Sequence, residues 1–224
     1  MMLTVKDVAE FLSVSEKTVY RWISQKDIPA YKLGETYRFN KVELLEWATS
    51  KRIKVSYKIF DDEKTDAEPY TLSKVIESGG IYYHVAGDTK EAILESIVKI
   101  MNLPDDIDRE FLLEALMARE SLGSTAIGDG LAIPHVRNPI IFHIEKPIIS
   151  LCFLENSIDF DALDKKPVDT IFTIISPSIK IHLNILSKLS FFLRTPEFRA
   201  AIKSTSSRLN ILDAIMNFEK NIKD

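Results

Sequence analysis

The chain has 224 residues, of which 46% are hydrophobic and 28% are charged, a composition typical of a globular protein with room for two modest domains. No apolar run approaches the ~20 residues that span a bilayer, and the N-terminus lacks the basic and then apolar pattern of a signal peptide, so we expect a cytoplasmic protein without a membrane segment. The single cysteine, Cys152, excludes an internal disulfide and a cysteine metal cluster, and its apolar neighbours predict that it is buried.

Charge is distributed unevenly along the chain. The net charge is −4, but residues 1–58 hold 11 Lys/Arg and 7 Asp/Glu, whereas residues 59–224 hold 18 and 26. The first part therefore carries +4 and the second −8. A basic N-terminal part favours contact with nucleic acid, although a surplus this small is weak support by itself.

Residues 3–13 and 16–25 have the pattern of two short helices joined by a tight turn. Thr4, followed three places later by Asp7, resembles a capping box, and Ser15 offers a second N-cap. Apolar residues recur at helical spacing in both segments. This pattern predicts a helix-turn-helix, whose second helix would enter the major groove of DNA.

A small β-ribbon and a third helix are expected next. Residues 31–33 and 36–39 alternate as two strands around the Gly34-Glu35 turn, which predicts a wing. Asn40 can then cap a third helix whose apolar residues close the core of this domain.

The segment LTVKDVAEFLSVSEKTVYRWISQKDIPAYKLGETYRFNKVELLEW, residues 3–47, resembles the excisionase/MerR-like winged helix-turn-helix family almost continuously. The resemblance implies DNA binding through the recognition helix and the wing. The residues that it implies as phosphate or base contacts are Ser15, Lys17, Thr18, Arg21, Lys32 and Arg38. The alternative is a helical interaction module whose charges only solvate its surface, because small winged helices also contact proteins.

The segment after the third helix begins basic, turns acidic and ends at Pro69 without a sustained period, as a linker does. We therefore expect a first domain over residues 1–54, a linker over 55–69 and a second domain over 70–224. Within the second domain, strands are expected over 81–85, 148–154 and 168–176, the last two too continuously apolar to be half exposed.

Helices should alternate with these strands. The first helix is expected from a cap at Asp88 to about residue 101, and the next two over 107–120 and 179–193. Pro196 then starts another turn, and the segment 209–218 ends the domain. This alternation predicts a mixed-sheet α/β sandwich, preceded by the small winged helix-turn-helix domain.

The stretch RESLGSTAIGDGLAIPHVR, residues 119–137, has the composition of an anion site beside a nucleophile. Glycines let backbone N–H groups approach a phosphate, hydroxyls add donors and arginine supplies a bidentate clamp, so Gly123, Ser124 and Thr125 are candidate phosphate-binding residues. His135 is a candidate for covalent chemistry, because a neutral imidazole can attack phosphorus. A single histidine after a strand is more often structural, so the residues alone leave both interpretations open.

The same stretch resembles the signature RE-x-x-G-[ST]-T-A-x-G-x-G-x-A-x-P-H of the enzyme IIA domain of the fructose/mannitol type of the bacterial sugar phosphotransferase system, which includes the nitrogen-regulatory branch. The pattern is unbroken from Arg119 to His135, and the resemblance spans about residues 70–219. It implies an enzyme IIA type 2-like fold, in which His135 is the phospho-acceptor and Arg119 is the active-site arginine.

A second family motif contains another histidine, His182. The segment PSIKIHLNILSKLSFFL resembles the family's P-x-x-x-x-H-L-x-x-L-S-x-L, in which a histidine stands beside the phosphorylated one. The resemblance implies that His182 fixes the tautomer of His135 and helps to hold the phosphoryl oxygens. We expect His84 and His143 to be structural or exposed. The chain has no H-x-x-x-H pair, so no metal or cofactor is expected.

These features predict a metal-independent phosphotransferase system IIA component. Its reaction would be in-line phosphoryl transfer from a histidine phosphocarrier protein onto His135, and then to an enzyme IIB or regulatory protein. Because this domain is joined to a DNA-binding domain, the phosphorylation state of His135 would bias how the two domains dock or dimerise, and hence whether DNA is bound. Such small DNA readers often act as homodimers, but the sequence specifies no interface.

The alternative is a DNA-binding regulator whose IIA-like domain binds a protein or ligand without accepting phosphate. The presence of Arg119, His135 and His182 together favours the first interpretation, because a domain that no longer accepts phosphate has no chemical need for all three. A pure sugar-transport component is disfavoured by the lack of a membrane segment or second transport domain.

Overall fold

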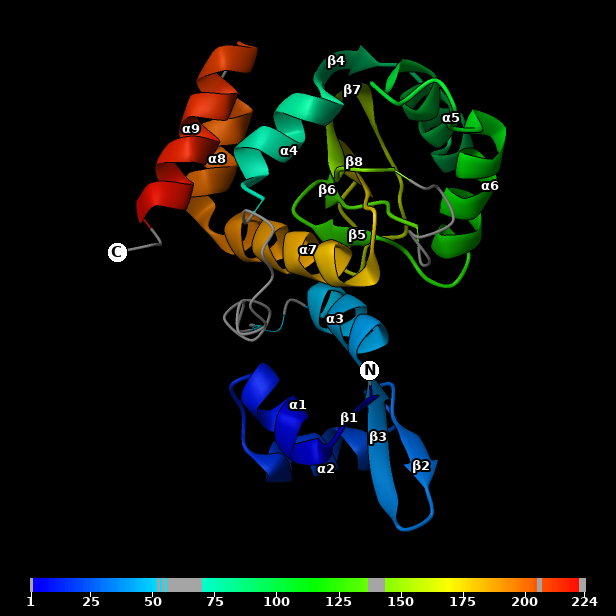
Figure 1. The fold of residues 1–224 in the computed structure, drawn as a ribbon, viewed down its shortest axis with the longest axis vertical. Coiled ribbons are helices and arrows are strands. Elements are labelled where there is room, and N and C mark those ends of the chain that lie inside the picture. Colours follow the sequence, from blue (N-terminus) through cyan, green and yellow to red (C-terminus); the bar gives the residue numbers. More distant parts are fainter. Residues whose placement is uncertain are drawn as a thin grey trace. The chain divides into compact units, whose positions relative to one another are not determined.

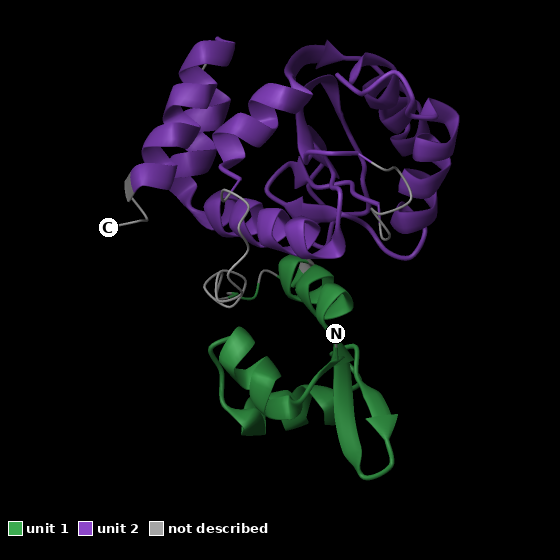
Figure 2. Ribbon diagram, viewed as in Figure 1, with its two compact units in different colours: residues 1–66 green, residues 67–224 purple. Residues whose placement is uncertain are grey.

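The computed structural model describes residues 2–51, 53, 55, 70–136, 144–204 and 207–221. The chain divides into two compact units, residues 1–66 and 67–224 (Figure 1, Figure 2). Apart from Val55, the expected linker lies outside the described residues, so the expected domain boundaries stay predictions. Within the described ranges, no helix is both long and apolar enough to cross a membrane.

The first unit is a helix-turn-helix with a β-ribbon. Its sheet has the order β1-β3-β2 and is antiparallel throughout. The elements are β1 (Met2–Leu3), α1 (Val5–Phe11), α2 (Glu16–Ser24), β2 (Tyr31–Leu33), β3 (Thr36–Asn40) and α3 (Lys41–Ser50). The expected helices and wing are confirmed, whereas β1 was not expected, because two residues that pair with a distant strand carry no readable period.

Local hydrogen bonds start the helices of this unit. The Thr4 hydroxyl oxygen accepts from the Asp7 N–H at 3.2 Å, and the Asp7 carboxylate accepts from the Thr4 N–H at 2.8 Å, which completes the expected capping box. Hydrogen bonds from the Thr4 backbone and hydroxyl lower the pKa of Asp7 below its ordinary value. The Asn40 side chain caps α3, and the Tyr31 hydroxyl donates to Glu43 at 2.6 Å, which ties the wing to α3.

The second unit is a five-stranded mixed sheet of order β4-β7-β8-β6-β5 with helices on both faces. Strand β7 is parallel to β4 and antiparallel to β8, and β8 is parallel to β6. The elements are α4 (Leu72–Gly79), β4 (Ile81–Val85), α5 (Lys90–Ile100), α6 (Arg109–Glu120), β5 (Ala126–Gly128), β6 (Leu131–Ala132), β7 (Ile148–Ile158), β8 (Val168–Ile175), α7 (Ile179–Arg194), α8 (Pro196–Ser204) and α9 (Arg208–Asn221). The expected mixed-sheet α/β sandwich is confirmed.

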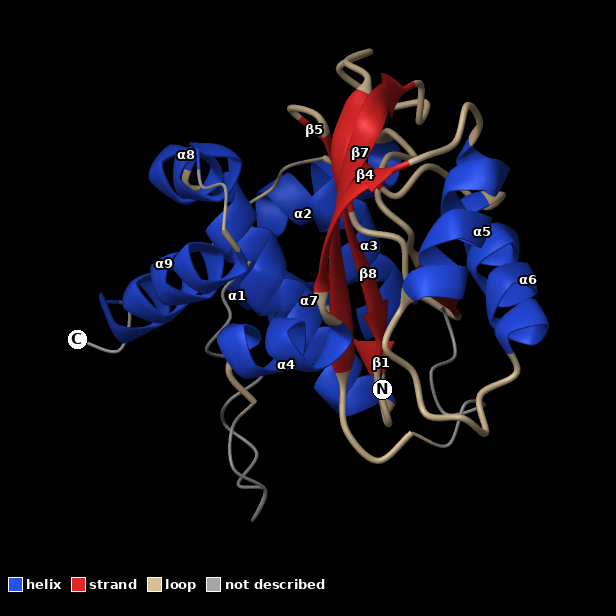
Figure 3. Ribbon diagram, turned by 90° about the horizontal axis from the view of Figure 1, so that it is seen from above, coloured by secondary structure: helices blue, strands red, loops and turns tan. Residues whose placement is uncertain are grey.

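Strand β8 is buried along nearly its whole length and β7 is buried over residues 148–152, as their apolar runs predict. Helices α5 and α6 cover one face, and α4 and α7 cover the other (Figure 3). Cys152 of β7 and Ile171 of β8 point into the core beneath α5 and α6. Cys152 is a free, fully buried thiol, and this burial raises its pKa to about 12.

Several element ends differ from those expected. Thr89, not Asp88, caps α5 by accepting from the Ala92 N–H at 3.1 Å. Both residue types are good caps, and the chain becomes helical only after Thr89, which is itself extended. Strand β7 continues past residue 154 to Ile158, because Ile158 still pairs with Val168 of β8.

A long-range contact caps helix α4. The Glu219 carboxylate of α9 accepts from the Leu72 N–H at 2.5 Å, the Ser73 N–H at 3.2 Å and the Ser73 hydroxyl at 2.7 Å. A carboxylate is favoured there because the first turn of a helix presents unpaired N–H groups and the positive end of the macrodipole. The C-terminal helix therefore holds the start of the second unit.

The first prediction concerns the end of α4, where the backbone meets β7. A Cβ at Gly79 would lie 2.2 Å from the Ile149 carbonyl oxygen, and the Ser150 hydroxyl donates to the Gly79 carbonyl at 2.8 Å. We expect Gly79→Ala to lower the free energy of unfolding by about 2–4 kcal/mol, because one backbone must move away from the other. Urea denaturation measures it. Ser78→Ala, an exposed neighbour in the same helix, should change the midpoint little, and equal midpoints for both variants would contradict the expected clash.

Candidate functional site

Two histidines meet at the end of the central sheet. The ring centroids of His135 and His182 are 5.1 Å apart and the ring planes are inclined at 42°. His135 forms an isolated parallel bridge with Ile174, next to the end of β8. The segment after β8 leads through Ser178 into α7. His182 lies in the first turn of α7, where its backbone N–H donates to the Ser178 carbonyl at 2.9 Å. The sheet thus brings together two histidines that are far apart in the sequence.

One contact fixes the tautomer of the neutral His135 ring. Its Nδ1 lies 2.8 Å from the carbonyl oxygen of Ile133. A carbonyl oxygen only accepts, so Nδ1 carries the hydrogen and the lone pair of the neutral ring is on Nε2. His135 is 4% exposed and His182 is 1% exposed, so both rings are almost fully buried.

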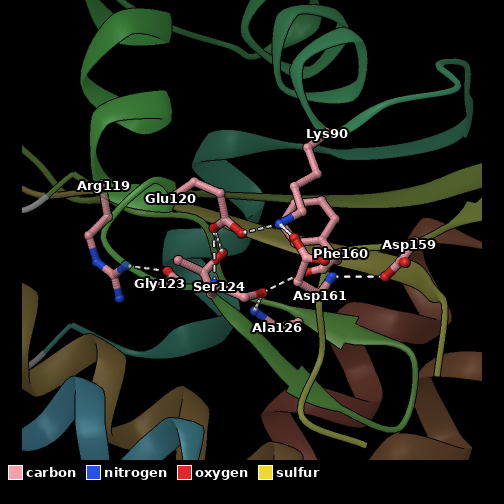
Figure 4. Close-up of polar contacts among 10 residues, drawn as sticks. Lys90, Arg119, Glu120, Gly123, Ser124, Ala126, Asp159, Phe160 and Asp161 are labelled. Atoms are coloured by element: carbon pink, nitrogen blue, oxygen red, sulfur yellow. Dashed lines mark hydrogen bonds and ion pairs between the residues drawn. The ribbon is translucent and has the colours of Figure 1, made fainter. Parts of the chain in front are cut away.

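Arg119 is folded over the loop that follows it. The residue lies in the last turn of α6, as expected, and is 8% exposed. Its Nη1 donates to the Gly123 carbonyl at 2.9 Å (Figure 4). The far end of the loop is bonded to the segment before His135, because the Ile133 N–H donates to the Thr125 carbonyl at 3.0 Å.

The two candidate phosphate-binding hydroxyls donate to protein acceptors. The Ser124 hydroxyl donates to the Phe160 carbonyl, and its oxygen accepts from the Ala126 N–H at 3.1 Å. The Thr125 hydroxyl donates to the Glu120 carboxylate at 2.6 Å, and the Thr125 N–H donates to the same oxygen at 2.9 Å. In this conformation both hydroxyls shape the loop, and phosphate binding by Gly123, Ser124 and Thr125 stays a prediction.

An ion network lies behind this loop and was not expected from the sequence: the Glu120 side chain is buried, Lys90 is half-buried and Asp161 is exposed. The Lys90 ammonium contacts Glu120 at 3.2 Å and Asp161 at 2.6 Å, and lies 5.2 Å from the centroid of the Phe160 ring (Figure 4). Burial alone would lower the pKa of Lys90, but the Asp161 and Glu120 carboxylates outweigh it and raise this pKa above its ordinary value. Lys90 is therefore charged at neutral pH. The sequence held one signal for this network: Glu120 is the second residue of the signature that begins at Arg119, and no role was assigned to it.

The other two histidines were expected to be structural or exposed. His84 is exposed, as one of the two expected alternatives, and His143 lies outside the described residues. Among the residues that the structure describes, no group of three or more His, Cys, Asp or Glu side chains could hold a metal ion. Metal independence stays a prediction.

The residues expected to contact DNA differ in how accessible they are. Lys17 and Arg21 of α2 and Lys32 of β2 are exposed. Arg38 is half-buried, and its guanidinium donates to the Tyr37 carbonyl at 3.0 Å.

Ser15 and Thr18 have a local structural role. The Ser15 hydroxyl oxygen caps α2 by accepting from the Thr18 N–H at 3.2 Å, and the two hydroxyl oxygens are 3.0 Å apart. Sequence reasoning did not select Tyr20, which is 48% exposed and packs edge-on against Tyr37 at a centroid distance of 6.5 Å. This ring contact joins α2 to the wing strand β3.

The fold and the histidine pair define a domain of the enzyme IIA class, preceded by a helix-turn-helix domain. The chain belongs to the family described as phosphoenolpyruvate-dependent sugar phosphotransferase system, EIIA 2, whose model matches residues 74–218. A helix-turn-helix domain model matches residues 2–52. Both family resemblances seen in the sequence are confirmed.

Individual relatives agree with this assignment. The chain is 34% identical over 137 residues to a nitrogen regulatory protein of Pseudomonas aeruginosa, covering 59% of this chain and 86% of that protein. It is 28% identical over 152 residues to the fructose-specific EIIABC component of the phosphotransferase system of Bacillus subtilis, covering 66% of this chain and 24% of that protein. The solved nitrogen regulatory protein IIA-Ntr of Neisseria meningitidis superposes with a TM-score of 0.57 at 26% identity, covering 64% of this chain and 98% of that one.

Proposed function

We propose that this protein is a phosphohistidine carrier that also regulates transcription. Its second unit accepts a phosphoryl group on Nε2 of His135 from a histidine phosphocarrier protein and passes it to an enzyme IIB or a regulatory protein. The observation that carries the proposal is the pair of rings 5.1 Å apart, with Nδ1 of His135 held by the Ile133 carbonyl. Membership of the EIIA 2 family supports it.

The proposed step is an in-line transfer between two imidazoles. The Nε2 lone pair of His135 attacks the phosphorus of the donor's phosphohistidine, a new N–P bond forms, and the donor's N–P bond breaks with its electron pair left on the donor ring. The hydrogen on Nδ1 stays in place and keeps its bond to the Ile133 carbonyl. Such a step needs alignment and charge stabilisation more than covalent machinery.

The incoming group carries about two negative charges at neutral pH, and local groups of this chain can stabilise them. His182 stands in the first turn of the 16-residue helix α7, where the macrodipole is equivalent to roughly half a positive charge. In the proposed mechanism the His182 ring and the Arg119 guanidinium contact the phosphoryl oxygens. No step in it uses a metal ion.

Direct phosphorylation tests this function. The protein is incubated with phosphoenolpyruvate, the first enzyme of the system and its phosphocarrier protein, and protein-bound, acid-labile phosphate is then measured. We expect about one labile phosphate per chain, the capacity of a single acceptor imidazole. Absence of label, with a known IIA protein labelled in parallel, would overturn the proposal.

A second function is a regulator whose IIA-like domain binds a protein or ligand and is not phosphorylated. The 4% exposure of His135 favours it, because a buried ring limits access for a donor. The same labelling experiment separates the two functions.

The first unit is proposed to bind DNA, as a homodimer in the cytoplasm. Helix α2 would enter the major groove, and the exposed Lys17, Arg21 and Lys32 would contact phosphates or bases. Because phosphorylation adds negative charge to the same chain, we propose that the state of His135 alters DNA affinity. Identical affinity of phosphorylated protein and His135→Ala protein would contradict this coupling.

The second prediction tests the DNA contacts. We expect Arg21→Ala and Lys32→Ala each to weaken binding to a duplex and to reduce the slope of log affinity against log salt by about one, because each removes one phosphate contact. Fluorescence anisotropy over a salt series measures this. Lys99→Ala, which removes an exposed lysine of the second unit that pairs with Glu95, is the matched control and should change neither value. Unaltered affinity and slope in the first two variants would favour a protein-interaction module.

A further inference from the structure

We propose that Glu120, held in place by Lys90, is a positioning residue for the acceptor imidazole of His135. This inference rests on the proposed phosphocarrier function and assigns a role to the ion network of Lys90, Glu120 and Asp161 behind the site. Glu120 touches neither the ring nor the phosphoryl group in this role. It acts through the loop that follows it.

A continuous series of hydrogen bonds runs from the network to the ring. Lys90 contacts one oxygen of Glu120 at 3.2 Å, and Thr125 donates to the other from its N–H at 2.9 Å and its hydroxyl at 2.6 Å. The Thr125 carbonyl accepts from the Ile133 N–H at 3.0 Å. The Ile133 carbonyl in turn holds Nδ1 of His135 at 2.8 Å. Each bond in the series fixes the position of the next group.

A charged carboxylate suits this place better than a neutral group. The Glu120 residue is 7% exposed, and a buried carboxylate is tolerated when its oxygens are paired with a cation and with hydrogen-bond donors. Two donors converge on one oxygen, which a carboxylate accepts readily because each oxygen has two lone pairs. Glutamine at this position would offer one acceptor oxygen to Thr125 and turn its NH₂ group toward the Lys90 ammonium. Two hydrogen-bond donors would then face each other without an acceptor.

The same residue also closes the loop that carries the Arg119 contact. The Gly123 N–H donates to the Glu120 carbonyl at 3.1 Å, and the Gly123 carbonyl accepts from Arg119 at 2.9 Å. The loop is therefore held at both ends by Glu120, through its backbone and through its side chain. A change in the side chain should shift the proposed phosphate-contacting groups and the acceptor ring together.

The test compares Glu120→Gln and Thr125→Val with Thr125→Ser. Serine keeps the hydroxyl that donates to Glu120 but loses a methyl group, whereas valine keeps the volume but loses the donor. A role in packing alone predicts that serine is the more harmful change, and positioning through the hydrogen bond predicts the opposite. Lys99→Met, on the same helix as Lys90 and in the exposed pair with Glu95, is the control for loss of a lysine ion pair.

Two measurements are made on the full chain, well below the unfolding temperature of each variant. For the rate of phosphorylation at saturating phosphocarrier protein, we expect a fall of roughly 10- to 100-fold in Glu120→Gln and Thr125→Val, with little change in KM, because small misplacement of a reacting group is costly. Lys99→Met should remain within about twofold of the parent protein, and Thr125→Ser should lose clearly less rate than Thr125→Val, because serine keeps the hydroxyl that donates to Glu120.

The second measurement is the ¹⁵N spectrum of the His135 ring, which reports the tautomer without any phosphorylation. We expect Glu120→Gln to lose part of the Nδ1–H form that the parent protein shows. Parental rates and parental ring spectra in Glu120→Gln and Thr125→Val, or a larger rate loss in Thr125→Ser than in Thr125→Val, would overturn the proposal. If the parent protein takes up no phosphate, the proposed function fails, and the ring spectrum alone still decides whether Glu120 positions the imidazole.

Discussion

Replacing His135 with alanine is expected to abolish acid-labile labelling of this protein, a loss of at least about a thousandfold, because the change removes the proposed attacking lone pair on Nε2. The bond from Nδ1 to the Ile133 carbonyl leaves the lone pair of the neutral ring on Nε2, so the change removes the proposed nucleophile. Transfer of radioactive phosphate from the phosphocarrier protein, followed by acid treatment, measures the loss.

A surface histidine serves as the matched control for this experiment. His84→Asn removes an exposed imidazole at a position with a φ of 54°, a conformation that asparagine accepts more readily than most residues. We expect full labelling of this variant. Label that persists in His135→Ala would contradict the assignment of the acceptor. If that residual label disappeared on further replacement of His182, the acceptor would be the second ring of the pair.

The second large effect is expected at Arg119. Arg119→Met should slow phosphorylation at saturating donor by about 10²–10³-fold, because a donor aimed at developing negative charge contributes that much in comparable sites. Arg119→Lys should recover only part of the rate, since lysine keeps the charge but loses the planar fork that bonds to the Gly123 carbonyl and presents further donors. Quenched-flow measurement of the labelled protein over a donor series separates this rate from KM.

The matched control is the arginine at the opposite end of the same helix. Arg109 donates to the carbonyls of Val98 and Met101, so its removal also breaks bonds to backbone oxygens in this unit. We expect Arg109→Lys to lower the thermal stability but to leave the rate of phosphorylation unchanged below the unfolding transition. Equal slowing in the Arg109 and Arg119 variants would mean that Arg119 acts through stability and not on the phosphoryl group.

The sequence by itself determined most of the local elements and the family to which the chain belongs. The capping box at Thr4, the glycine turn of the wing and the continuous apolar runs of β7 and β8 all depend on neighbouring residues, so their patterns are readable along the chain. The unbroken signature from Arg119 to His135 predicted the family, and the segment around His182 predicted a partner histidine that the fold does bring to the first ring.

The tertiary structure alone decided which groups the side chains of the site bond to. The Ser124 and Thr125 hydroxyls have donor capacity that suits a phosphate, but in the fold they donate to Phe160 and Glu120. Lys90 stands on a different helix from Glu120, and Glu219 caps α4 from the far end of the chain. Such contacts join segments that approach only when the sheet and helices pack. Composition and period describe neighbours along the chain, so they carry no information about which distant groups will meet.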